Sequence, residues 1–109
     1  MAKIIERCTD MKDIHCPDTD ALFAAMLTLK NEDECYKFFK DVCTPKELEA
    51  MSQRFLVARQ LDEGRNYNDV SEDTGASSAT ICRVSKCLQH GGGYRIVLDR
   101  LKKAGVKGK

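Results

Sequence analysis

The apolar residues of this chain recur every three to four positions along most of its length, a spacing that places them on one face of an α-helix. No segment shows the strict alternation of apolar and polar residues that a half-buried strand requires. The pattern therefore predicts an all-α protein with six helices, over residues 18–29, 31–42, 44–63, 66–74, 77–90 and 94–103.

The helix over residues 44–63 has the clearest start and end. Thr44 and Glu47 have the spacing of a capping box, in which each side chain accepts a hydrogen bond from the other residue's amide. Pro45 falls at the first helical position, where its missing N–H costs nothing, and Gly64 follows the last turn. Because a thin monomer cannot cover a helix that is apolar on two sides, we expect a homodimer in which this helix also packs against its twin. One apolar face carries Leu48, Met51, Phe55, Ala58 and Leu61, and the other carries Ala50, Leu56 and Val57.

The first two helices are expected to complete the core. Asp18, Thr19 or Asp20 is suited to cap the first helix. Asn31 and Glu34 repeat the capping pattern for the second. The apolar residues of the first helix are Leu22, Phe23, Met26, Leu27 and Leu29, and we expect the aromatic part of the core to come from Tyr36, Phe38, Phe39 and Val42 of the second.

Residues 66–90 have the pattern of a helix-turn-helix. Asn66 or Asn68 is placed to cap the first helix, and Ser77 is placed to cap the second. Gly75 lies between them, where the chain needs a positive φ. The spacing predicts an apolar wedge of Val70, Ala76, Ile81 and Val84 and an outer surface with Ser78, Thr80, Cys82, Arg83 and Lys86. Such a surface suits a DNA groove, although helical hairpins also occur purely as packing units.

Charge is segregated along the chain and favours nucleic-acid binding. Residues 76–109 contain eight basic residues and one acidic residue, a net charge of +7, whereas residues 1–75 have a net charge of −6. Phosphate binding is a local effect, so a basic segment that contains the second helix of the pair matters more than the whole-chain charge of +1. For Lys102 to Lys109 alone, a solvated tail is the simpler interpretation.

Length and composition predict one domain, with an N-terminal arm over residues 1–17, a helical domain over residues 18–104 and a basic tail over residues 105–109. No apolar run is long enough for a membrane span and the N-terminus lacks a signal-peptide core, so we expect a cytoplasmic protein.

The six cysteines show no metal-site spacing, and we expect neither metal nor disulfides. Cys35 and Cys43 are expected to be small buried hydrophobes. Cys82 is expected near the exposed face of the second helix of the pair, as a thiol switch or as a small residue tolerated against DNA.

Two sequence blocks carry a resemblance to a known family. The first is Thr44-Pro45-x-Glu47-x-Glu49-Ala50-Met51-x-x-Arg54, and the second is Gly75-Ala76-x-x-Ala79-Thr80-Ile81-x-Arg83. Together they resemble the tryptophan repressor superfamily over residues 20–101. The ending Tyr94-Arg-Ile-Val-Leu-Asp-Arg-Leu101, after a run of glycines, is most similar to its tryptophan-repressor-like branch in Gram-positive bacteria. The resemblance implies an intertwined six-helix homodimer whose fourth and fifth helices bind operator DNA.

The resemblance also implies an effector pocket formed by Thr44, Arg54, Arg83, Val84 and Cys87. In tryptophan-binding members two arginines sandwich the indole, and these match Arg54 and Arg83. A glycine of those members is Val84 here, and a serine that binds the ligand's amino group is Cys87. We therefore expect that L-tryptophan is not the effector, because Val84 would crowd the ring and a thiol is the weaker hydrogen-bond partner.

These observations predict a transcriptional regulator that binds double-stranded DNA as a homodimer. An enzyme is not expected, since no nucleophile, acid–base or phosphate-binding arrangement is present in the sequence. The alternative is a protein-interaction module that uses the same dimeric scaffold without specific DNA binding. The predicted DNA-binding residues are Asn68, Ser77, Ser78, Ala79, Thr80, Cys82, Arg83 and Lys86.

Overall fold

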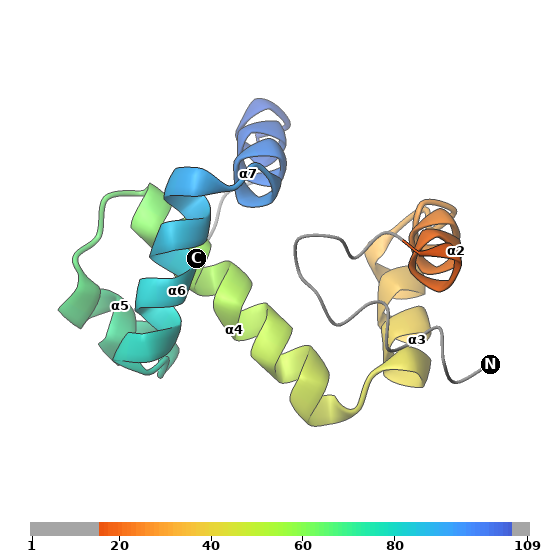
Figure 1. Cartoon of the computed structure of the whole chain (residues 1–109), viewed down its shortest axis with the longest axis horizontal. Coiled ribbons are helices and arrows are strands. Elements are labelled where there is room, and N and C mark those ends of the chain that lie inside the picture. The colour runs from red at the N-terminus through yellow and green to blue at the C-terminus, as the bar shows by residue number, and fades with distance from the viewer. Residues whose placement is uncertain (1–15, 106–109) are drawn as a thin grey trace. The chain divides into compact units, whose positions relative to one another are not determined.

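A computed structural model describes residues 16–105 of the chain, which contain six helices and no strand, as predicted (Figure 1). The chain divides into two compact units, one ending at Val42 and the other beginning at Cys43, and each is described by itself. The predicted arm lies outside the described residues except for its last two positions, and the predicted tail except for its first.

The first unit contains α2 (Pro17–Met26) and α3 (Glu32–Val42). The predicted cap of α2 is wrong: Pro17 occupies the first turn after Cys16, whose side chain makes no capping hydrogen bond. Proline suits that position because it needs no N–H donor. The helix also ends at Met26, before the predicted Leu29, because the amides of Thr28 and Leu29 bond to carbonyls three residues back and tighten the chain into a turn.

The cap of α3 is confirmed, since the Asn31 Oδ1 accepts a hydrogen bond from the Glu34 amide at 2.9 Å. The predicted aromatic core is wrong for a single chain. No residue of α3 is buried, and Tyr36 is 63% exposed. Phe38 and Phe39 meet edge to face, with ring centroids 5.4 Å apart, but both stay half-buried. Two short helices offer too little surface to cover each other's apolar sides.

The second unit begins with α4 (Pro45–Asp62), whose predicted capping box is confirmed. The Thr44 amide donates to the Glu47 carboxylate at 2.8 Å, and the Glu47 amide donates to the Thr44 hydroxyl at 3.1 Å. Gly64 adopts a φ of 90° after the last turn, as expected. Figure 1 shows that α5 (Tyr67–Thr74) and α6 (Ser78–His90) pack against the C-terminal half of α4.

The core of the second unit lies where α4, α5, α6 and α7 (Gly93–Lys103) meet. It contains all four residues of the predicted wedge. The N-terminal half of α4 contributes nothing to it, because residues 45–52 are exposed or half-buried. The buried apolar residues are Val57, Ala58, Val70, Ala76, Ile81, Val84 and Leu98.

Asp62 joins the end of α4 to α7 through two cations. Its carboxylate accepts hydrogen bonds from Arg95 at 2.6 Å and Lys102 at 2.8 Å, and its side chain is only 11% exposed. Arg95 also pairs with Asp99 at 3.1 Å, one turn further along α7. These hydrogen bonds hold the pKa of Asp62 below its usual value, with Arg95 contributing most, and burial acts in the opposite direction.

The cysteines differ from expectation at three positions. Cys43 is half-buried rather than buried. Cys35 is exposed rather than buried, because α3 buries no residue. Cys16 is disulfide-bonded, although the sequence pattern indicated free thiols throughout, because residue spacing does not report how closely two sulfurs approach in the fold. Cys43, Cys82 and Cys87 are free thiols.

Among residues 16–105, no helix is long and apolar enough to cross a membrane. The same residues contain no group of three or more His, Cys, Asp or Glu side chains placed to hold a metal ion.

Candidate nucleic-acid interface

Local hydrogen bonds define both helices of the predicted helix-turn-helix. Asn66, rather than Asn68, caps α5, since its Oδ1 accepts from the Asp69 amide at 2.8 Å. Gly75 ends α5 with a φ of 74°, as predicted, a left-handed conformation that costs glycine little. The Ser77 hydroxyl then accepts from the Thr80 amide at 3.2 Å and caps α6, also as predicted.

Side-chain hydrogen bonds hold the turn between the two helices. The Thr74 hydroxyl donates to the Val70 carbonyl at 2.7 Å and accepts from the Ala76 amide at 3.1 Å. The Ser71 hydroxyl donates to the Ala76 carbonyl at 3.1 Å. With Ala76, Ile81 and Val84 buried below it, the turn fixes how α6 leaves α5.

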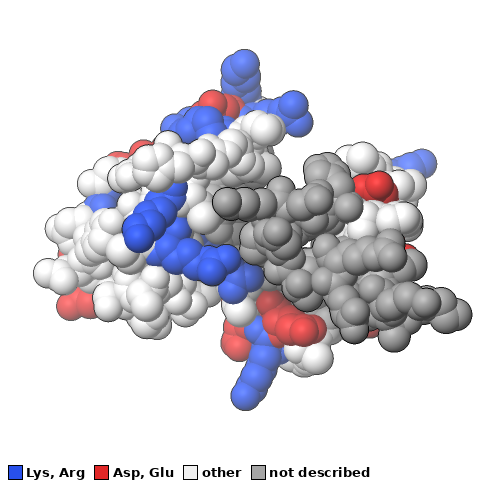
Figure 2. Space-filling model, viewed as in Figure 1, with Lys and Arg blue, Asp and Glu red and all other residues white. Residues whose placement is uncertain are grey.

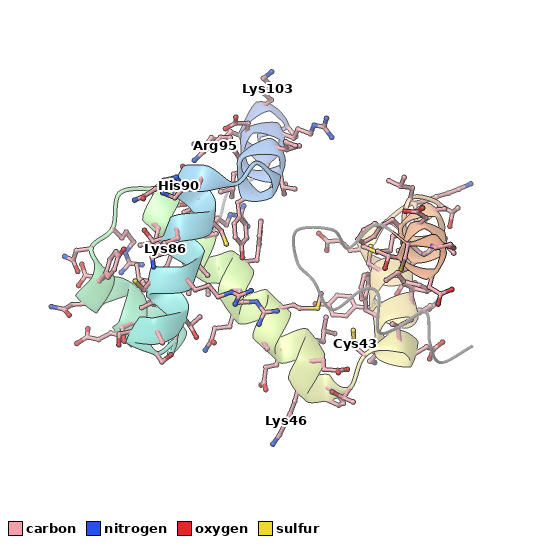
Figure 3. All side chains as sticks on the ribbon, in the orientation of Figure 1. Cys43, Lys46, Lys86, His90, Arg95 and Lys103 are labelled. Carbon is pink, nitrogen blue, oxygen red and sulfur yellow. The ribbon has the colours of Figure 1, made fainter. Side chains whose placement is uncertain are left out.

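The outer face of α6 carries most of the residues predicted to bind DNA. Ala79, Cys82, Arg83 and Lys86 are exposed and follow the i, i+3, i+4, i+7 spacing of one strip along a helix. Ser77 and Ser78 are exposed at its N-terminus, while Thr80 is half-buried. Lys86 and His90 lie one turn apart on this helix (Figure 3). Small side chains therefore occupy its first turn and cations its middle.

The two helices of the pair carry opposite charges. No acidic residue occurs between Asp73 and Asp99, so α6 has cations and no carboxylate. Figure 2 shows Lys and Arg side chains in a run across the second unit. By contrast, α5 has exposed Asp69, Glu72 and Asp73 and no basic residue. Asn68, the predicted DNA contact on α5, is exposed beside these carboxylates.

Three of the five predicted effector-pocket residues act electrostatically on the same side chain. Arg54, Arg83 and Cys87 all influence the pKa of the half-buried phenol of Tyr94, at the start of α7. Burial raises the pKa of Tyr94, Cys87 adds to the rise, and the positive charges of Arg54 and Arg83 oppose it. The sequence pattern did not predict a role for Tyr94; its only signal was an aromatic residue directly after the glycine run.

The other two predicted pocket residues are Val84 and Thr44. Val84 follows Arg83 on α6, is only 1% exposed and belongs to the core. Thr44 caps α4 ten residues before Arg54, a helical rise of about 15 Å, and its hydroxyl accepts the capping bond. Thr44 and Arg54 therefore lie about three helical turns apart along α4.

Known proteins are similar to this chain in both fold and sequence. Over 86 residues the chain is 48% identical to the uncharacterised protein YerC of Bacillus subtilis (strain 168), a stretch covering 78% of this chain and 83% of YerC. A crystal structure from Staphylococcus aureus, provisionally assigned as a Trp repressor, matches with a TM-score of 0.81 and 38% identity, over 93% of this chain and 99% of that one. A TrpR-like protein from Eubacterium eligens ATCC 27750 matches with a TM-score of 0.78 and 45% identity, over 88% of this chain and 97% of its own.

The sequence model of the Trp repressor protein family matches residues 18–102, which is most of the chain. The family model, the relatives and the six-helix fold agree with the resemblance that the two sequence blocks carry. The chain therefore belongs to the Trp repressor protein family.

Proposed function

We propose that this protein is a transcriptional regulator that binds double-stranded DNA as a homodimer through α5 and α6. The observation that carries the proposal is the exposed strip on α6, which presents small side chains in the first turn, cations in the middle and no carboxylate. In helix-turn-helix proteins the second helix enters the major groove with its N-terminal residues against base edges. The strip on α6 has the chemistry that this placement requires.

Within this proposal the residues divide between base edges and phosphates. Lys86 and Asn68 are assigned to phosphates, where a cation and an amide donor position the protein without reading the sequence. Arg83 is assigned to the edge of the interface, since it is exposed on α6 and its charge also acts on Tyr94. The residues assigned to base edges are Ser77, Ser78, Ala79, Thr80 and Cys82.

Exposed apolar side chains in a single chain support the homodimer. Ile96 and Val97 of α7 are 51% and 45% exposed, and Met51 is exposed on the uncovered half of α4. Burial of such residues stabilises by about 25 cal/mol per Å², which favours covering them with a second copy. A twofold dimer would place two α6 helices in successive major grooves, at half-sites about 34 Å apart.

Selection of bound sites from random DNA, followed by titration at several salt concentrations, tests the proposal. Lys86→Ala should weaken binding to all sequences and reduce the salt slope by about 1, because one phosphate contact is lost. Ala79→Phe should weaken the selected site much more than random DNA, since it crowds the groove. Lys37→Ala, which removes a charge from α3, is the matched control and should do neither.

The titrations also decide between the proposal and its alternative. Equal binding of the selected site by the parent, Lys86→Ala and Ala79→Phe would show that α6 does not enter the groove. If the parent protein showed no salt-sensitive DNA binding at all, the protein-interaction module would replace the regulator. In bacteria a regulator of this kind acts in the cytoplasm and needs no catalytic centre.

A further inference from the structure

Two glutamines of α4 hold the last turn of α5. The Gln53 Nε2 donates to the Thr74 carbonyl at 3.1 Å, and the Gln60 Nε2 donates to the Asp73 carboxylate at 2.5 Å. The two glutamines are seven residues apart, which places them on the same face of α4. Both bonds therefore act on the same short segment, directly before the turn into α6.

Gln60 is an unfavourable residue for stability alone. Its side chain is 1% exposed, and its Oε1 has no hydrogen-bond partner among residues 16–105. A buried acceptor without a partner loses its hydration and gains nothing in return. A methionine of similar size would fill the same space without that cost. In some proteins a buried polar group is retained because it selects one packing geometry over others.

Asp73 connects Gln60 to the link that joins α4 and α5. Arg65 lies in that link, and its guanidinium donates a hydrogen bond to the same carboxylate at 3.2 Å. The end of α5 is thus held by the body of α4 and by the segment that leads into α5. Since only Gly75, Ala76 and Ser77 separate α5 from α6, the same contacts act on the direction in which α6 projects from α4, together with the direct packing of α6 on α4.

We propose that Gln53 and Gln60 are positioning residues that set the angle of α6 relative to α4, and thereby the half-site spacing that the dimer accepts. This inference rests on the proposed function. In a twofold dimer both α6 helices tilt by the same angle. A small rotation therefore changes the distance between the two helices by twice the shift of one. The glutamines touch no DNA in this arrangement and act only through α5.

The test uses Gln60→Met with DNA in which two fixed half-sites are separated by different numbers of base pairs. The parent should prefer one spacing. Gln60→Met should accept neighbouring spacings and lose about tenfold in affinity at the preferred one, the factor that corresponds to about one hydrogen bond. Its salt slope should not change, because no charge has been altered.

Two substitutions of Asp73 and one control separate positioning from packing. Asp73→Asn keeps an oxygen that accepts from Gln60 and should retain the parent's spacing, whereas Asp73→Ala should behave like Gln60→Met. Ser52→Ala is the matched control, since the Ser52 hydroxyl donates to the Leu48 carbonyl within α4 at 2.9 Å and does not reach α5. It should leave the spacing preference unchanged.

Hydrogen exchange provides a readout that does not depend on DNA. The amides of Gly75, Ala76 and Ile81 are hydrogen-bonded in and beside the turn, and they should exchange about tenfold faster in Gln60→Met but not in Ser52→Ala. A variant that lost stability yet kept both the parent's exchange pattern and its spacing preference would overturn the inference. If the parent bound no DNA, the proposed function would fail, and the inference about half-site spacing would fail with it.

Discussion

Replacing Asp62 with asparagine should destabilise the protein by about 1 to 2 kcal/mol at pH 7. The carboxylate is 11% exposed and accepts hydrogen bonds from Arg95 at 2.6 Å and Lys102 at 2.8 Å. Hydrogen bonds to charged groups contribute about 1.5 to 3 kcal/mol each, but both cations here are substantially exposed, so the solvent screens part of that value. Asparagine keeps one acceptor, and its amide nitrogen would face a cation.

The loss should depend on pH in a defined direction. The pKa of Asp62 is lowered from its usual value of 3.8 in the folded chain, chiefly by the hydrogen bond from Arg95. A group whose folded pKa is depressed adds stability above its unfolded pKa, and that stability disappears as the pH falls through the folded pKa. The difference between parent and Asp62→Asn should therefore be constant from pH 7 to pH 5 and shrink below pH 3.8.

Urea denaturation at pH 7, 5 and 3 measures this difference, with the protein concentration held fixed because dimer stability depends on it. Asp33→Asn is the matched control: it removes an acid–lysine pair at 3.1 Å whose two side chains are about three-quarters exposed, and should cost at most about 0.5 kcal/mol. Equal unfolding free energies for Asp62→Asn and the parent at pH 7, or a difference that grows in acid, would refute the reasoning.

Three further outcomes are expected. Gly75→Ala should lower stability by about 1 to 2 kcal/mol in thermal unfolding, because a φ of 74° is strained for alanine. Steric contact adds little, since the new Cβ would meet only the Gln53 side chain, at 3.9 Å. Thr44→Ala should cost about 1 kcal/mol in the same measurement by removing one half of the capping box. Calorimetric titration with L-tryptophan should show no micromolar binding, since Cys87, one turn after Arg83 on α6, is a weak hydrogen-bond partner for the ligand's amino group. Tight binding that raises DNA affinity would contradict this expectation.

The sequence predicted the elements that depend on neighbouring residues. Thr44 with Glu47, Asn31 with Glu34, Gly75 and Ser77 each act within one turn of the chain, so their spacing alone determines the local hydrogen bonds. The wedge of the helix-turn-helix was also predicted, because its residues have the spacing at which two short helices joined by a tight turn bury their facing sides.

Features that depend on contacts between distant segments were not predicted. The bond from Gln60 to Asp73 joins residues thirteen apart, and the charge of Arg54 acts on Tyr94 from another helix. The one available signal was the pair Gln53 and Gln60, two amides seven positions apart on an otherwise apolar side of a helix. The exposure of Tyr36 was missed because periodicity shows which face is apolar and not what covers it.

The opposite charges of α5 and α6 give the helix-turn-helix an electric dipole across two adjacent helices. With Asp69 and Glu72 on α5 and Arg83 and Lys86 on α6, the field of a polyanion would attract one helix and repel the other. If the domain binds DNA as proposed, α6 would approach ahead of the acidic side chains of α5, so a larger share of diffusional encounters would begin in one orientation. Added salt shortens the range of this field to about 10 Å at 0.1 M, so the benefit appears chiefly in the association rate and fades as ionic strength rises.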